Sequence, residues 1–234
     1  MTTPSIALLN AAHKADDTRE NFRRELDADV TEFHCPSGEL PTNFCYDGFV
    51  VTGSRASVYW DEPWIGALKE WVGEAVRAGV SALGVCFGHQ LLADVMGGSV
   101  QSMGEYEIGY RTVYQDGENR LLADVPDDLT VFTTHSDHVT QKPPGAEVFA
   151  KNEYGIHGFR KDRAFAVQFH PEYDMETART VTSSKSDQLS SERIEDVLAD
   201  ITAENYDAAC EAKRLFDNFL EFVVEVQRER ATAD

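Results

Sequence analysis

The stretch Gly-Val-Cys-Phe-Gly-His-Gln at residues 84–90 decides how this chain folds and where its chemistry lies. An apolar run, 80–83, precedes it and an apolar helical pattern, 91–96, follows it, so the sequence predicts a strand, a sharp turn and a helix. The two glycines suit a strained and crowded turn. Such an elbow lifts the thiol of Cys86 to a helix N-terminus, where free N–H groups favour the nucleophilic thiolate.

A second run supplies the partners that a nucleophile needs. Residues 164–170, Ala-Phe-Ala-Val-Gln-Phe-His, predict a buried strand that ends at His170, and Pro171 and Glu172 follow. The carboxyl end of this strand is expected at the same sheet edge as the elbow. Glu172 is close enough in sequence to orient the imidazole. Cys86, His170 and Glu172 are therefore a candidate triad of nucleophile, base and orienting carboxylate.

Together these residues resemble the class I (triad) glutamine amidotransferases. The runs at 84–92 and 167–172 look like the two signatures of that family, and Phe-Val-Val-Thr-Gly-Ser at 49–54 resembles the strand and turn that supply part of its oxyanion hole. The three runs occur in the expected order. The details are closest to the stand-alone branch similar to the amidotransferase domain of GMP synthase, and the resemblance weakens after about residue 180.

The resemblance implies a role for each matched residue. Cys86 would attack the side-chain amide of L-glutamine to give a γ-glutamyl thioester and ammonia, and His170, oriented by Glu172, would move the proton. The oxyanion would be held by backbone N–H groups of Phe87 and of Gly53 or Ser54. The residues that would bind glutamine are Gln90 and, in a loop spanning 134–138, His135, Ser136 and Asp137. No cofactor is implied.

Three functions stay open at this stage. The first is glutamine hydrolysis that supplies ammonia to a synthase such as GMP synthase; the chain has no Gly-x-x-x-x-Gly-Lys phosphate loop of its own, so the ammonia acceptor would be a separate subunit, or the protein works alone. The second is a stand-alone γ-glutamyl peptide or conjugate hydrolase with the same triad. The third is a catalytically silent regulatory module of the same fold.

The balance of acidic and basic residues limits the kinds of partner that the protein can bind. Acidic residues outnumber basic ones 41 to 21, the net charge is −20, and only 7 of the basic residues are Lys. This balance argues against nucleic-acid binding, which needs a basic face. Acids spread along the whole chain suit a surface that works in high salt, where self-repulsion is screened, so we expect a halophilic source.

The remaining composition indicates a cytoplasmic protein without a metal. The four cysteines form no disulfide or metal-binding pattern, and we expect neither a leader peptide nor a membrane helix. His135 and His138 are spaced like metal ligands, but only Asp137 lies near them in sequence, so we expect no metal site.

The order of strands and helices predicts an α/β fold. We expect a mainly parallel open sheet flanked by helices, the flavodoxin-like class I amidotransferase fold, with an antiparallel part between residues 97 and 170. A single domain would cover 1–234, with a catalytic core over 1–175 and a helical extension over 176–234. Within the extension, the Ser-rich stretch 180–191 predicts a loop, and one last helix is expected to begin near residue 202.

Overall fold

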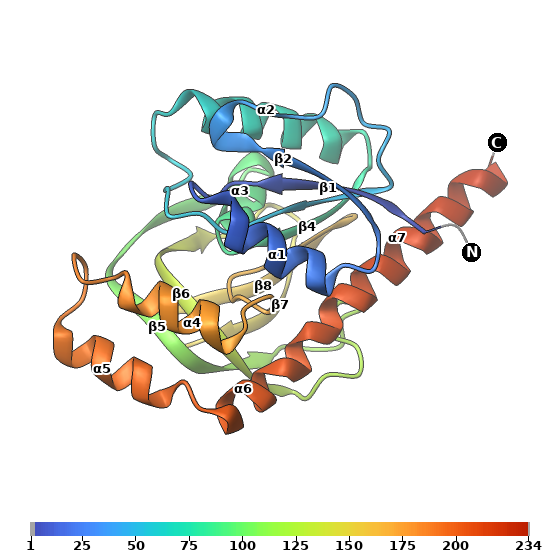
Figure 1. The fold of residues 1–234 in the computed structure, drawn as a ribbon. Helices are drawn as coiled ribbons and strands as arrows, with labels where there is room; N and C mark the ends of the chain where they lie inside the picture. Colours follow the sequence, from blue (N-terminus) through green and yellow to red (C-terminus); the bar gives the residue numbers. More distant parts are fainter. Residues whose placement is uncertain (1–2, 234) are drawn as a thin grey trace.

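The computed structural model describes residues 3–233 and contains one mixed sheet of nine strands with helices on both faces (Figure 1). Across the sheet the strands lie in the order β2-β1-β3-β4-β9-β8-β7-β5-β6. The strands are β1 (Ser5–Asn10), β2 (Asp29–His34), β3 (Gly48–Val51), β4 (Ser81–Val85), β5 (Ser99–Gln115), β6 (Asp128–Gln141), β7 (Glu147–Asn152), β8 (Gly155–Lys161) and β9 (Ala164–Val167). The helices are α1 (Ala15–Glu25), α2 (Pro63–Arg77), α3 (Phe87–Val95), α4 (Met175–Ser183), α5 (Ser191–Asp200), α6 (Ala203–Cys210) and α7 (Arg214–Ala233), with short 3₁₀ turns at Cys35–Ser37 and Glu211–Lys213.

The sheet has a parallel half and an antiparallel half. Strands β2, β1, β3, β4 and β9 pair in parallel, and β9, β8, β7, β5 and β6 pair antiparallel. Val85 at the end of β4 lies opposite Val167 at the end of β9. The turns that follow these two strands therefore meet at one edge of the sheet, as the sequence predicted, and the predicted α/β fold is confirmed.

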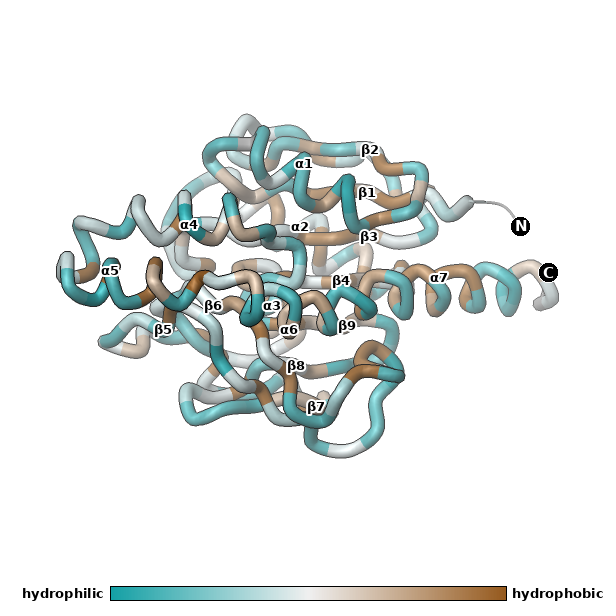
Figure 2. Tube along the Cα trace, turned by 60° about the horizontal axis from the view of Figure 1, so that its bottom comes forward, coloured by the Kyte–Doolittle hydropathy of each residue, from teal (hydrophilic) through white to brown (hydrophobic). Residues whose placement is uncertain are grey.

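Helices bury both faces of the parallel half. One apolar cluster joins α1 and α7 to the sheet, and Figure 2 shows the apolar stretch of α7 beside β4 and β9. A second cluster packs α2 and α3 on the opposite face. Strands β1, β3, β4 and β9 are buried on both sides, which explains why each is a continuous apolar run in the sequence.

The helical extension differs from the prediction in two places. Residues 180–183 belong to α4 and are not part of a loop; the Asp174 carboxylate caps this helix by accepting a hydrogen bond from the Thr177 N–H, and Ala178 and Thr182 are buried. The expected last helix is divided by the 3₁₀ turn Glu211–Lys213 into α6 and α7. A third apolar cluster holds α4 and α5 against β5 and β6.

No helix within residues 3–233 is long and apolar enough to cross a membrane.

Candidate active site

Cys86 occupies a strained position between β4 and α3. Its φ of 54° and ψ of −101° lie outside the regions that non-glycine residues ordinarily adopt. The Cys86 N–H donates to the Val167 carbonyl at 2.9 Å, which ties the elbow to β9. The backbone conformation that projects the thiol from the sheet is thus held by the neighbouring strand.

The two glycines of the elbow are required by close packing. A Cβ on Gly88 would overlap the Val51 carbonyl, and a Cβ on Gly84 would overlap the Gly88 carbonyl. Neither glycine has a positive φ. The sequence therefore predicted the elbow correctly, but the unusual backbone angles fall on Cys86 itself, and the glycines allow α3 to approach β3 and β4.

His170 lies between a carboxylate and the thiol. Its Nδ1 is 2.8 Å from Glu172 Oε1, and both its ring and the Cys86 side chain border the backbone of Gly53. Burial opposes the positive charge of the imidazole, but Glu172 and Cys86 outweigh it and raise the pKa of His170 to about 10. All three side chains are buried, and the Tyr173 ring stacks on His170 with a centroid separation of 4.2 Å. The structure thus brings the three predicted triad residues together.

The predicted oxyanion residues border the same point. A Cβ on Gly53 would come within 2.8 Å of His170 Cε1 and 3.6 Å of Cys86 Cβ, so the loop after β3 passes directly beside both side chains. The Ser54 hydroxyl accepts a hydrogen bond from the Ala56 N–H and shapes this loop. Phe87 is the first residue of α3, where a backbone N–H has no partner within the helix.

The predicted substrate-binding residues lie close together, but not in a loop. Residues 134–138 are part of β6, because β5 pairs with this stretch and places Glu107 opposite His135. Gln90 donates from Nε2 to the Asp137 carbonyl at 2.9 Å and to Gln168 Oε1 at 3.0 Å. The expectation of a loop at 134–138 was therefore wrong.

Two of these side chains are already engaged within the protein. The Asp137 carboxylate accepts hydrogen bonds from the Ser57 and Tyr59 hydroxyls and so fixes the loop after β3 to β6. His135 is buried with its Nδ1 2.9 Å from the Asp137 carbonyl. Only Ser136 has a partly exposed side chain in this group.

A buried cluster that sequence reasoning missed lies behind this strand. The Glu107 carboxylate has Oε2 2.7 Å from His135 Nε2 and 3.2 Å from His157 Nε2, and its Oε1 accepts a hydrogen bond from Asn152 at 2.7 Å. Burial disfavours the charge on Glu107, but the two histidines overcome this and lower its pKa to about 2. The three residues come from β5, β6 and β8, so only the strand pairing, and no local spacing, brings them together.

The same cluster has the composition of a partial metal site. Its three ligand atoms lie within 4.8 Å of one another. A structural zinc site needs four ligands, and among residues 3–233 no further His, Cys or carboxylate joins the group. Glu107 hydrogen-bonds Asn152 and His157 and lies at ion-pair distance from His135, while the buried Nδ1 of His157 has no hydrogen-bond partner.

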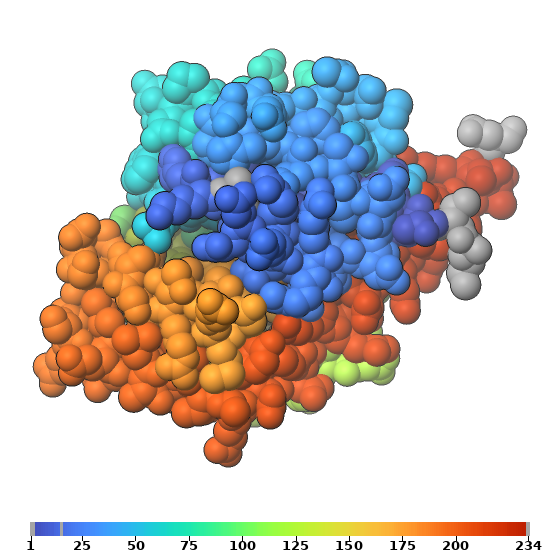
Figure 3. Space-filling view, viewed as in Figure 1, coloured from blue at the N-terminus to red at the C-terminus, as the bar shows by residue number. Residues whose placement is uncertain are grey.

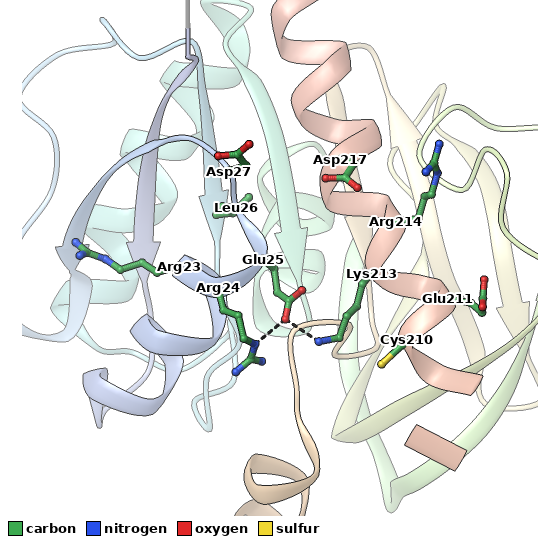
Figure 4. Close-up of a pocket in the computed structure, with 10 residues that line it drawn as sticks. All are labelled: Arg23, Arg24, Glu25, Leu26, Asp27, Cys210, Glu211, Lys213, Arg214 and Asp217. Carbon is green, nitrogen blue, oxygen red and sulfur yellow. Dashed lines mark hydrogen bonds and ion pairs between the residues drawn. The ribbon is translucent and has the colours of Figure 1, made fainter. Parts of the chain in front are cut away.

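An open groove of about 680 Å³ lies elsewhere, between the end of α1 and the start of α7. Figure 4 shows its charged walls, where the Glu25 carboxylate joins Arg24 at 2.8 Å and Lys213 at 2.7 Å. It does not include Cys86. Arg24 links this groove to the triad by donating to the Glu172 carbonyl at 2.6 Å.

Comparison with known proteins agrees with this geometry. The family model for glutamine amidotransferase class-I matches residues 19–186. The chain is 33% identical over 147 residues to a GMP synthase [glutamine-hydrolyzing] of Aromatoleum aromaticum, covering 58% of this chain and 27% of that protein. It is 32% identical over 140 residues to gamma-glutamyl peptidase 3 of Arabidopsis thaliana, covering 56% of each protein. The chain thus spans between about a quarter and somewhat over half of these relatives.

Solved structures share the fold. A glutamine amidotransferase from Thermotoga maritima superposes with a TM-score of 0.80 at 22% identity, covering 94% of this chain and all of that one. A glutamine amido transferase from Methylobacillus flagellatus gives a TM-score of 0.78 at 20% identity, covering 94% of this chain and 95% of that one.

Proposed function

The chain belongs to the class I glutamine amidotransferase family, and from that premise we propose that it hydrolyses the γ-amide of L-glutamine to glutamate and ammonia through Cys86. The observation that carries this proposal is the buried group of Cys86 on a strained elbow, His170 beside it, and Glu172 hydrogen-bonded to His170. A buried thiol, a base and an orienting carboxylate in this order are the parts of nucleophilic catalysis by cysteine.

The proposed reaction has two stages. The Cys86 thiolate attacks the amide carbon, and the N–H groups of Phe87 and of Gly53 or Ser54 stabilise the oxyanion, with about 3–4 kcal/mol expected for one donor. The imidazolium of His170 gives its proton to the leaving nitrogen, the C–N bond breaks, and a γ-glutamyl thioester remains. His170, now neutral, activates water to release glutamate. Glu172 keeps the imidazole oriented throughout.

We assign the glutamyl end of the substrate to the face formed by α3 and β6. Gln90 and Asp137 meet there, and the side chain of Ser136 is partly exposed. The internal bonds of His135 and Asp137 give these two side chains a supporting role, in which they fix Gln90 and the loop after β3. Ser136 and backbone groups of β6 are then the candidates for direct contact.

The test is glutaminase activity of the purified full chain, with Cys86→Ala as the matched variant. Glutamate release by the wild type alone supports the proposal. A Cys86→Ala protein that keeps wild-type turnover would contradict it. Release of ammonia in step with glutamate identifies hydrolysis of the side-chain amide.

A second candidate is the hydrolysis of γ-glutamyl peptides. It is favoured by the similarity to a gamma-glutamyl peptidase, which covers the same share of both chains. The two candidates share the triad and differ in the group that leaves. A catalytically silent regulatory module is the third, and an unchanged biological effect of Cys86→Ala would support it.

We propose further that a synthase subunit could accept the ammonia, since residues 1–234 themselves hold no phosphate loop. A single domain over 1–234 is supported by α7, which shares one apolar cluster with β1 and β4. The net charge of −20 supports a halophilic source.

A further inference from the structure

Buried imidazole nitrogens without hydrogen-bond partners are concentrated around Glu107. Among residues 3–233, seven buried side-chain nitrogen or oxygen atoms have no hydrogen-bond partner, and three of them are His89 Nε2, His135 Nε2 and His157 Nδ1. The ring centres of His135 and His157 are 5.6 Å apart. Burial lowers the pKa of His89 to about 3 and both other histidines add to the fall, so the three rings lie within electrostatic range of one another. Such atoms are costly to bury, so their concentration at one place calls for a physical reason.

The two nitrogens of His135 have different surroundings. Nδ1 is 2.9 Å from the Asp137 carbonyl oxygen, which can only accept, so this nitrogen carries the hydrogen of a neutral imidazole. Nε2 then holds a lone pair 2.7 Å from Glu107 Oε2, and the contact does not have the geometry of a hydrogen bond. A proton on Nε2 would not point at the oxygen, whereas a metal ion beside the pair can bind both atoms. A histidine ligand ordinarily has its other nitrogen fixed by a carbonyl in this way.

Glu107 and His157 offer two further ligand atoms at the same point. One atom from each of the three residues lies within 4.8 Å of the others. Asn152 donates to Glu107 Oε1 at 2.7 Å, so Oε2 is the oxygen that faces both histidines, with His157 Nε2 at 3.2 Å. Zinc binds nitrogen and oxygen at about 2.0–2.2 Å, which places tetrahedral ligands about 3.4 Å apart. Side-chain shifts of about 1 Å bring the three atoms to that spacing.

The ligand types favour a transition-metal ion. Two imidazoles and one glutamate are a known zinc ligand set, in which a water fills the fourth position. Mg²⁺ and Ca²⁺ prefer oxygen ligands throughout. His138, which the sequence pairs with His135, is not in the group: it is partly exposed, and its Nδ1 is 3.2 Å from the Tyr154 carbonyl. The sequence expectation of no metal site rested on that local pair, whereas these ligands come from three separate strands.

An ion at this point would join strands that are not neighbours in the sheet. β6 ends the sheet and is separated from β8 by β5 and β7, yet β6 and β8 are in contact. His135 belongs to β6, His157 to β8 and Glu107 to β5, and all three side chains are buried. Figure 3 shows the orange and red helices and the blue N-terminal part over one face of the molecule, with only small green parts of the chain visible between them. Such a site takes up its ion during folding or local opening.

We propose that Glu107, His135 and His157 bind one Zn²⁺ ion, with water as the fourth ligand, and that the ion fastens β5, β6 and β8 to one another. This inference does not depend on the proposed glutamine hydrolysis. The ion makes no contact with the reacting atoms in this proposal; its effect is on the stability of the antiparallel half. The Asp137 carbonyl, which His135 and Gln90 share, connects the site to α3.

The experiment is calorimetric titration of Zn²⁺ into the metal-free full chain carrying Cys86→Ala, because a thiol beside an imidazole also binds zinc. Since the ligands are buried, Zn²⁺ is also added during refolding from urea. We expect one ion per chain and a melting temperature that rises with Zn²⁺ but not with Mg²⁺. In the same background, Glu107→Gln and His157→Gln should each weaken Zn²⁺ binding by more than about 100-fold. His138→Gln is the matched control and should bind as before.

The outcomes separate a metal site from a network held by protons alone. No binding by either procedure would overturn the proposal, and so would unchanged affinity in folded Glu107→Gln or His157→Gln. If neither variant folds, X-ray absorption of the zinc-loaded Cys86→Ala chain decides. Two imidazoles with oxygen ligands support the site, and a sulfur ligand overturns it. Glutaminase activity of the wild type tests the proposed function separately, so either proposal can fail while the other stands.

Discussion

Within residues 3–233 two buried histidine–carboxylate clusters lie along this sheet, and one of them lies beside the candidate nucleophile Cys86. His170 and Glu172 meet Cys86 on a strained turn at the edge of the parallel half. His135 and His157 close around Glu107 in the antiparallel half, where all three side chains come from strands. The residue types are nearly the same, so a charged pair alone does not make a candidate catalytic site. The difference is the backbone: the first cluster is attached to turns that project side chains, and the second to strands that enclose them.

The largest expected difference between the clusters is in activity. His170→Asn should lower kcat for glutamine by about 10⁴-fold, because the thiol loses its base and the leaving nitrogen its acid. His157→Gln, the matched change in the second cluster, should leave kcat close to that of the wild type. Steady-state kinetics on both folded variants measures this. Equal losses would mean that the two clusters act as one unit, which would remove the distinction drawn here.

The second largest effect on activity is expected from a substitution at the crowded position beside the triad. Gly53→Ala would put a methyl group 2.8 Å from His170 Cε1 and displace the imidazole. A misplacement of about 1 Å can reduce the rate by about 100-fold. The control is Gly66→Ala in α2, where nothing lies within 4 Å of the added carbon and the helix should gain about 0.5–1 kcal/mol of stability. Glutaminase rates and thermal unfolding of both variants test the pair; normal activity in Gly53→Ala would show that the loop yields.

These two clusters also show what the sequence could predict. The elbow and the run ending at His170 are local patterns, and the parallel order of β3, β4 and β9 brings their ends together, so the sequence predicts that Cys86, His170 and Glu172 lie at one edge of the sheet. Glu107 and His157 are separated by 50 residues and meet only through the pairing of β5 with β7 and of β7 with β8. No local spacing indicates that register. For the same reason residues 134–138 were expected in a loop, although β5 extends far enough to pair with them.

The cluster around Glu107 should make the free energy of unfolding depend on pH in the acid range. The folded pKa of Glu107, about 2, is below the ordinary 4.5, so its contribution to the free energy of unfolding is fully present above pH 4.5 and is lost as the pH falls toward 2. Glu107→Gln should remove this part of the acid dependence and cost about 1–3 kcal/mol at pH 7. Urea unfolding of the two proteins between pH 2 and 7 measures it. A parallel pH profile in the variant would mean that other carboxylates carry the acid sensitivity.

The smallest expected effects concern salt, which should act on the exposed charges of the surface but hardly on the two buried clusters. Salt screens exposed charges over about 10 Å at 0.1 M and acts far less on buried pairs, so KCl should relieve the repulsion of a net charge of −20 while leaving the His170–Glu172 contact intact. We therefore expect the melting temperature to rise from low to molar KCl, with no change in the pH dependence of kcat. Replacing Glu195 and Asp196, two exposed acids of α5, by Gln and Asn should reduce the salt slope slightly. A melting temperature that does not change with KCl would contradict the halophilic source, whereas a pH profile that shifts with salt would mean that the triad is more open to solvent than its burial indicates.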